Sequence, residues 1–231
     1  MAAPSAATHA AEANRALAAA GQSDMVWGHA SVRDPDRHGV WIKAARIGFE
    51  EVTDDRVHLV SDDGEVVEGG GPRHVEYPIH TRIMAARPDV GCVVHTHSQA
   101  AVAFASLQVP LRPISHDGVL FVKPEVPRYE GTGSLIKTTA LGDELAATLG
   151  DAVAVLIPQH GLVTAGADPA TAVMYAVLLD RACRVQLQAM ACGQVTLWSS
   201  DAEVDRKREE MWFPAQFQAG YDYLLRNSRT P

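Results

Sequence analysis

The stretch Val93-Val94-His95-Thr96-His97-Ser98 closes one apolar run, and a later apolar run, 153–157, leads into Pro158-Gln159-His160-Gly161. Side chains alternate along a β-strand, so His95 and His97 lie on one face and can bind one cation together. His160 is expected to complete the set. Three nitrogen ligands with an open fourth position are typical of a catalytic metal site. The alternative is that these are hydrogen-bonded histidines at strand ends, but the His-x-His spacing with a third histidine before a glycine favours the metal.

Imidazole ligands suit several divalent metal ions, and the sequence does not choose among Zn, Mn, Fe and Co. The composition is that of a globular protein, with 47% hydrophobic and 21% charged residues. A net charge of −8 without a basic cluster argues against nucleic acid or an anionic membrane as a partner. No apolar run approaches the ~20 residues that a membrane span needs.

The cysteines and the N-terminal stretch bear on location. The cysteines Cys92, Cys183 and Cys192 are odd in number and form no CxxC pair, which is typical of a reducing compartment. Residues 1–20 are rich in alanine and lack a basic segment before an apolar block, so a signal peptide is not expected. The sequence therefore predicts a cytoplasmic protein.

Helical and strand patterns alternate along the chain and predict one α/β domain over 1–231, with a core at about 10–192 and a C-terminal helix and tail at 203–231. Helices are expected at 6–20, 77–87, 99–107, 138–149, 168–191 and 203–213. Asp168 as N-cap and Pro169 at the first position mark the start of the longest one. Strands are expected at 30–33, 40–43, 57–60, 65–68, 90–95, 152–157 and 162–164. Residues 110–133 should be irregular with short strands, and 215–227 should trail after the last helix.

Glu76 is the second candidate for chemistry. It follows the loop Gly69-Gly70-Gly71-Pro72 and precedes a helix whose far end feeds the strand of His95. A carboxylate there could simply favour the helix N-terminus, worth ~0.3–1 kcal/mol. It could equally serve as a general acid or base beside the metal. The sequence leaves both interpretations open.

The motifs Gly28-His29-Ala30-Ser31-Val32-Arg33, Glu76 before a helix, His95-Thr96-His97 and Gln159-His160-Gly161, in this order, resemble the class II aldolase/adducin family over about 10–192. The resemblance implies a three-layer α/β/α sandwich around a mainly antiparallel sheet. It implies a homotetramer with active sites between neighbouring subunits. It also implies that His95, His97 and His160 bind the metal and that Glu76 is the catalytic acid or base.

The departures from the family's sugar-phosphate aldolases concern the phosphate pocket. His29 replaces an asparagine, Lys43-Ala44-Ala45-Arg46 lies near a Thr-Gly loop, and Arg73-His74-Val75 replaces a pair of serines. The hydroxyl cradle is lost while cationic groups remain, and a guanidinium binds a carboxylate well. We therefore expect a carboxylated, unphosphorylated substrate. Its expected contacts are His29, Ser31, Lys43, Arg46, Arg73 and His74; the alternative for the cationic members is that they are solvated surface charges.

Two further features relate to the aldolases. A tyrosine that assists protonation in the aldolases is replaced around Ser115-His116-Asp117, so His116 is either an alternative proton donor or a residue that caps a turn. Aromatic residues near the C-terminus either cover a neighbouring subunit's site or simply pack. These are Trp212, Phe213, Phe217, Tyr221 and Tyr223.

The Trp27-Gly28-His29-Ala30-Ser31 start and the lost phosphate pocket look more like the family's aromatic-acid decarboxylases. The resemblance therefore implies a metal-dependent carbon–carbon lyase. Its expected reaction is decarboxylation of a hydroxylated aromatic dicarboxylate of the dihydroxyphthalate type, as in aromatic compound catabolism. One alternative is an aldolase acting on an unphosphorylated hydroxy-keto acid. Another is an adducin-like interaction domain without catalysis, which the three histidines and the glutamate disfavour because such domains have lost metal ligands.

Overall fold

The computed structural model describes residues 5–36 and 39–228, so residues 1–4 of the N-terminal stretch lie outside it. Its strands form one sheet in the order β4-β3-β2-β1-β5-β7-β6, and each neighbouring pair is antiparallel. The strands are β1 (His29–Arg33), β2 (Val40–Lys43), β3 (Val57–Val60), β4 (Val66–Glu68), β5 (Cys92–Thr96), β6 (Ala154–Ile157) and β7 (Gly161–Gly166). The predicted antiparallel sheet is confirmed.

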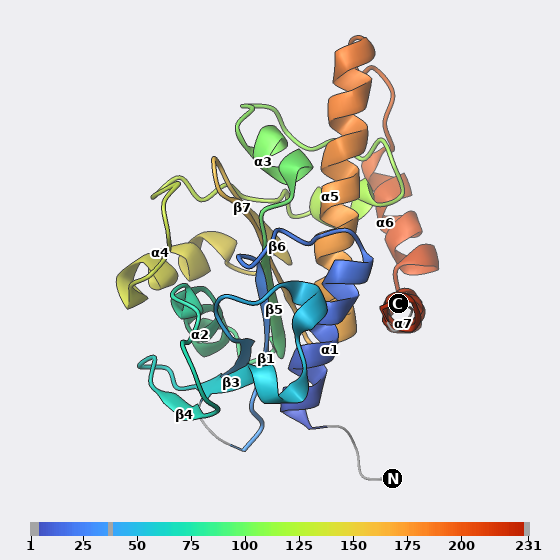
Figure 1. The fold of residues 1–231 in the computed structure, drawn as a ribbon. Coiled ribbons are helices and arrows are strands. Elements are labelled where there is room, and N and C mark those ends of the chain that lie inside the picture. Colours follow the sequence, from blue (N-terminus) through green and yellow to red (C-terminus); the bar gives the residue numbers. More distant parts are fainter. Residues whose placement is uncertain (1–4, 37–38, 229–231) are drawn as a thin grey trace.

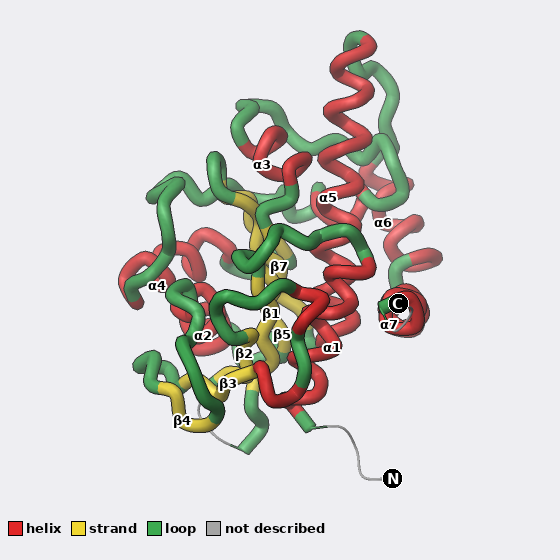
Figure 2. Tube along the Cα trace, in the orientation of Figure 1, coloured by secondary structure: helices red, strands yellow, loops and turns green. Residues whose placement is uncertain are grey.

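Helices cover both faces of this sheet (Figure 1). On one face lie α2 (Tyr77–Ala86) and α4 (Thr139–Leu149), and on the other lie α1 (Ala6–Ala19) and α5 (Pro169–Cys192). Figure 2 shows the same layering, with the strands between two sets of helices. The remaining helices are α3 (Gln99–Ala105), α6 (Asp201–Met211) and α7 (Pro214–Asn227). The three-layer α/β/α sandwich is confirmed.

The two layers follow from alternation within the strands. Val94 of β5 belongs to the hydrophobic core under α1 and α5, whereas its neighbour Val93 belongs to the core under α2 and α4. Leu162 and Val163 of β7 divide in the same way. A strand buried on both faces reads as a continuous apolar run, which is why the runs before His95 and His160 are unbroken.

Helix α5 begins as predicted and runs beyond the sheet. The Asp168 side chain accepts a hydrogen bond from the Thr171 backbone N–H, and Pro169 occupies the first turn. Figure 1 shows the C-terminal half of α5 projecting past the sheet edge. Within 5–36 and 39–228, none of the helices combines the length and hydropathy that crossing a bilayer requires.

Two expectations about the elements were wrong. Residues 110–133 contain a 3₁₀ helix, Gly118–Phe121, and isolated bridges rather than short strands. Residues 215–227 do not trail, because Pro214–Asn227 forms α7. Phe217, Tyr221 and Leu224 are buried along one face of α7, at a spacing of four and three residues. Burial of this stripe against α1 and α5 explains why the segment folds as a helix.

Candidate metal centre

The three predicted metal ligands lie at the end of β5 and at the turn that leads into the neighbouring strand β7. His95 is in β5, and His97 follows just beyond the strand end. His160 lies in the turn between β6 and β7, where Ile157 pairs with Gly161. A Cβ added at Gly161 would lie 2.3 Å from the Thr96 carbonyl oxygen, so only glycine lets this turn approach β5. That approach brings His160 to the pair on β5.

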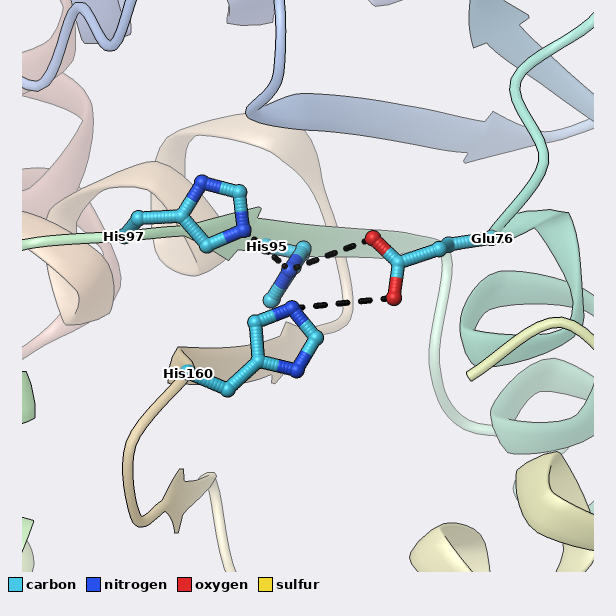
Figure 3. Close-up of side chains that lie close together, drawn as sticks. All are labelled: Glu76, His95, His97 and His160. Atoms are coloured by element: carbon cyan, nitrogen blue, oxygen red, sulfur yellow. Dashed lines mark hydrogen bonds and ion pairs between the residues drawn. The ribbon is translucent and has the colours of Figure 1, made fainter. Parts of the chain in front are cut away.

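The three imidazole rings and Glu76 face one another (Figure 3). The ring centroids are 4.7 Å apart for His95 and His97, 4.9 Å for His95 and His160, and 5.1 Å for His97 and His160. Glu76 Oε2 lies 3.8 Å from His95 Nε2, and Oε1 lies 3.6 Å from His160 Nε2. One ligand atom from each of the four residues falls within 4.8 Å of all the others.

Hydrogen bonds at the far side of two rings fix their tautomers. His95 Nδ1 is 2.9 Å from the Leu162 carbonyl oxygen, and His97 Nδ1 is 2.6 Å from Asp24 Oδ2. Both oxygens only accept, so in each neutral ring the proton is on Nδ1 and the lone pair on Nε2. The two Nε2 atoms nevertheless lie 3.1 Å apart. Lone pairs that face each other at this distance repel unless a cation lies between them.

The donor set and its spacing fit a divalent metal ion. Bonds of ~2.1 Å in a tetrahedral zinc site separate neighbouring nitrogens by about 3.4 Å, close to the separation of the two Nε2 atoms. A metal ligand histidine usually donates its other N–H to a carboxylate or a carbonyl, which is what His97 and His95 do. We conclude that the buried cluster of histidines and Glu76 is consistent with a divalent metal site.

Burial sets the charge state of these groups. It lowers the pKa of His160 to about 4 and the pKa of His95 well below its usual range, so both rings are neutral near pH 7. A metal ion therefore needs to displace no proton from them. Burial also raises the pKa of Glu76, which favours a carboxyl group that can hold a proton.

Glu76 occupies the N-cap position of α2, but its side chain makes no capping hydrogen bond. The side chain is 2% exposed, and Oε1 accepts a hydrogen bond of 2.8 Å from the Ile136 backbone N–H. The carboxylate thus turns away from the helix end and toward the histidines. Of the two interpretations that the sequence left open, this geometry favours the chemical one.

Two of the expected substrate contacts, His29 and His74, lie next to Glu76, and Lys43 is close enough to affect both rings. His29 pairs with His95 across β1 and β5, and its ring contacts the tilted ring of His74, with centroids 3.8 Å apart and 52° between the planes. Lys43 is fully buried, and its ammonium donates to the carbonyls of Val26 and Ile47. Burial lowers the pKa of Lys43 to about 8, so it remains mostly charged at neutral pH.

His29, His74 and Glu76 also have ligand atoms within 4.8 Å of one another. Their arrangement differs from that of the first cluster, since the centroids of the His29 and His74 rings are closer than those of any ring pair in it. Burial lowers the pKa of both rings, and the positive charge of Lys43 lowers it further and would repel a second cation. We interpret this group as hydrogen-bonding partners for a substrate rather than as a second metal site.

The other expected site residues lie elsewhere. Ser31 is fully buried and bonded to His80. Arg46 is exposed, in the left-handed backbone region at φ 70°. Arg73 donates to the Gly64 carbonyl and stacks on Tyr77 at 4.2 Å. The side chain of His116 is exposed, and it does not belong to either cluster of possible metal ligands.

Sequence reasoning missed Asp24 and His80. Asp24 holds His97 from the loop after α1, and no spacing relative to His97 could have shown this. His80 lies four residues after Glu76 in α2, one helical turn along, and contacts both His29 and Ser31. That Glu-x-x-x-His spacing was the available signal, because residues four apart share a helix face.

Comparison with known proteins identifies similar chains. Residues 8–187 match the model of the family described as Class II Aldolase and Adducin N-terminal domain. The chain is 32% identical over 194 residues to a 3,4-dihydroxyphthalate decarboxylase of Terrabacter sp. (strain DBF63), covering 79% of this chain and 80% of that protein. It is 32% identical over 182 residues to the Meiotically up-regulated gene 14 protein of Schizosaccharomyces pombe, covering 78% and 70% of the two chains.

A solved structure of L-fuculose 1-phosphate aldolase from Glaciozyma antarctica PI12 has the same fold. The two superpose with a TM-score of 0.84 at 28% identity, over 96% of this chain and 88% of that one.

Proposed function

The chain belongs to the class II aldolase and adducin family, and from that premise we propose that it is a metal-dependent carbon–carbon lyase that decarboxylates a hydroxylated aromatic dicarboxylate. The observation that supports this best is the convergence of three imidazole Nε2 atoms on a buried carboxyl group. Breaking a carbon–carbon bond leaves an electron pair on carbon, and the reaction needs both a place for that charge and a proton to replace the lost group.

The residues of this cluster divide those tasks. His95, His97 and His160 would hold the divalent ion, which when bound supplies a Lewis acid for the negative charge on the substrate oxygens. Glu76 holds the proton: burial raises its pKa, and the carboxyl group faces the cluster. As the bond to the carboxylate breaks and carbon dioxide leaves, the ring carbon keeps the electron pair and takes the proton from Glu76. Solvent then reprotonates Glu76.

We assign the contacts to the retained substrate carboxylate to His29 and His74. The positive charge of Lys43, which acts on both rings, would add electrostatic attraction. A buried cation and neutral N–H donors suit a carboxylate, which can accept several hydrogen bonds. Arg46 and Arg73 stay proposals for the same role. Assembly as a homotetramer with sites between subunits is also proposed, in which His116 and α7 would approach a neighbour's site.

An aldolase is the second candidate, supported by the structural similarity to an L-fuculose 1-phosphate aldolase. Aldol cleavage leaves the same electron pair on carbon, so the cluster around Glu76 serves either reaction. The residues that would contact the rest of the substrate distinguish a decarboxylase from an aldolase. Here His29 and His74 bring imidazole groups to Glu76, where an aldolase of this family would bind phosphate through hydroxyl groups.

The test is elemental analysis of purified protein, together with carbon dioxide release from 3,4-dihydroxyphthalate and related hydroxylated di-acids. We expect one metal ion per chain and release of carbon dioxide. His97→Ala should lose both, while the control His9→Ala, a histidine on α1 outside the cluster, should keep both.

The other outcomes separate the alternatives. Metal without carbon dioxide, but with aldehyde trapped from L-fuculose 1-phosphate or an unphosphorylated hydroxy-keto acid, would make the protein an aldolase. A protein that binds no metal even after reconstitution would refute the lyase proposal altogether.

A further inference from the structure

His97 lies where the sheet no longer holds the chain. The last residue pair between β5 and β7 is Thr96 with Leu162, and His97 follows in the two-residue segment that leads to α3. A cavity of about 270 Å³ borders this segment, so packing does not fix it on that side. Thr96 is tied by its hydroxyl, which donates to the buried Gln22 side-chain oxygen at 3.1 Å. A metal ligand just beyond a strand end needs such supporting contacts on both sides to keep its position.

The contact on the other side of His97 comes from α5. The Ser98 hydroxyl donates to Asp180 Oδ1 and accepts from the Ala101 backbone N–H, which makes Ser98 the N-cap of α3. A hydroxyl has one proton, and since the amide of Ala101 can only donate, that proton is directed at the carboxylate. One side chain therefore joins the segment of His97, the start of α3 and the middle of α5.

Asp180 is 5% exposed, although most of the other buried residues of α5 are apolar. Its carboxylate also accepts from Arg184 Nη2, at 2.9 Å and 3.3 Å, but the Arg184 side chain is 57% exposed. An ion pair with so exposed a partner contributes little to stability, whereas burying the carboxylate is costly. The hydrogen bond from Ser98 is thus what a buried carboxylate supplies at this place and an apolar residue could not.

We propose that Asp180 is a positioning residue for the metal ligand His97, acting through the hydroxyl of Ser98. Helix α3 packs against α5 (Figure 1), and this hydrogen bond fixes the segment between β5 and α3 to the same helix. Asp24 fixes the ring of His97, and Asp180 fixes the backbone that carries the ring. The effect on metal binding rests on the proposed function; the hold of α5 on this segment does not.

Zinc affinity, measured by competition with a fluorescent chelator, tests the effect on the metal. Asp180→Leu should raise the dissociation constant for zinc about 10-fold, the lower end of the range for groups that bond a ligand directly, because Asp180 acts through one more residue. Asp180→Asn, whose side-chain oxygen can still accept from the Ser98 hydroxyl, should recover most of the affinity. Arg184→Met should bind zinc as the wild type does, because it removes only the exposed partner of Asp180.

A double-mutant cycle distinguishes action through Ser98 from a general loss of structure. If Asp180 acts through this hydroxyl, Ser98→Ala should raise the dissociation constant as much as Asp180→Leu does, and the double variant should raise it no further. Independent effects would instead multiply to about 100-fold. Ser200→Ala is the matched control, because it removes the same kind of N-cap from α6 and leaves the histidine cluster untouched.

Hydrogen exchange in the metal-free protein tests the hold on the segment. The backbone amides of Ala101 and Val102 donate to the hydroxyl and the carbonyl of Ser98. Both should exchange faster in Asp180→Leu than in the wild type, because Ser98 is no longer fixed to α5. The exchange of these two amides should not change in Ser200→Ala.

The outcomes separate the positioning role from the proposed function. If Ser98→Ala binds zinc within twofold of the wild type, the positioning role is wrong, even if Asp180→Leu does not fold. A double variant weakened by the product of the two single effects would also overturn it. If the wild-type protein binds no zinc after reconstitution, the proposed function fails. In that case unchanged exchange at Ala101 and Val102 would refute the hold of α5 on the segment, and faster exchange would confirm it.

Discussion

Replacing Asp24 by asparagine should weaken metal binding without removing a metal ligand. Asp24 Oδ2 accepts the His97 Nδ1 proton at 2.6 Å, and this bond both orients the ring and increases the electron density on Nε2. Asparagine keeps an oxygen at this place but not the charge. The Asp24 side chain is 28% exposed and that of His97 is 19% exposed, so solvent weakens the interaction but does not remove it.

The expected size follows from measured changes of this kind. Loss of a carboxylate that orients a metal ligand raises the dissociation constant about 10–100-fold, or about 1.4–2.7 kcal/mol. At a zinc concentration of about 100 times the wild-type Kd, bound metal adds about 2.7 kcal/mol to the stability of the wild-type protein. For a variant with a 100-fold higher Kd, the same zinc concentration adds only about 0.4 kcal/mol.

Two measurements check the predicted loss of zinc affinity in Asp24→Asn. One is the dissociation constant for zinc, from competition with a fluorescent chelator, and the other is the rise in unfolding free energy when zinc is added. The matched control is Asp55→Asn, because Asp55 is exposed and accepts from the Thr53 hydroxyl, away from the histidines. The control should behave as wild type in both. An Asp24→Asn protein that binds zinc within twofold of wild type would refute the idea that this carboxylate supports the site.

Three further changes have defined outcomes. Glu76→Gln should keep the metal, because three histidines still hold it, and lower kcat at least about 100-fold, the contribution of a positioned acid; an unchanged kcat with full metal content would exclude Glu76 as the proton donor. Burial lowers the pKa of His74 and of His80 to about 3, below the unfolded value of 6.5, so the unfolded chain binds more protons between pH 6.5 and 3. Metal-free protein should therefore lose stability as pH falls through that window, by about 1.4 kcal/mol per pH unit for each histidine, and equal urea unfolding free energies at pH 7 and pH 5 would contradict this. Lys43→Met should lower the free energy of unfolding in urea by about 1–3 kcal/mol, since it leaves two partly buried backbone carbonyls without a donor, and a variant as stable as wild type would show that water replaces the ammonium.

Local periodicity predicted the strands and the placement of His95 and His97 side by side, whereas the antiparallel sheet was predicted from the family resemblance. Alternation within β5 places His95 and His97 on one side of the strand end, and a turn that only Gly161 allows brings His160 to them. The start of α5 was equally local, since Asp168 and Pro169 act within one turn. Helix α7 has a proline in its first turn and apolar residues spaced four and three apart, and its packing against α1 and α5 offsets the cost of Gly220 inside it.

The substrate contacts were harder to predict, because a charge in the sequence does not show where its side chain points. Lys43 lies in β2 and Arg73 in the loop before α2; the ammonium of Lys43 is buried against backbone carbonyls, whereas the guanidinium of Arg73 stacks on Tyr77. Asp24 and His80 were missed for a related reason. Each acts on a residue far from it in sequence, 73 residues for Asp24 and His97 and 51 for His80 and His29, so only the fold joins them.

The energetics of the cluster separate a lyase from an adducin-like binding domain. Five neutral histidines and a carboxyl group with a raised pKa lie together in the interior, namely His29, His74, His80, His95, His160 and Glu76. Burying such groups costs stability, and apolar residues of similar volume usually stabilise a core at least as well. A domain that only binds a partner through its surface gains nothing from this arrangement. A site that must hold a metal ion and move one proton gains neutral ligands and an acid that keeps its proton more strongly, and burial shifts the pKa values of His95, His160 and Glu76 in those directions here.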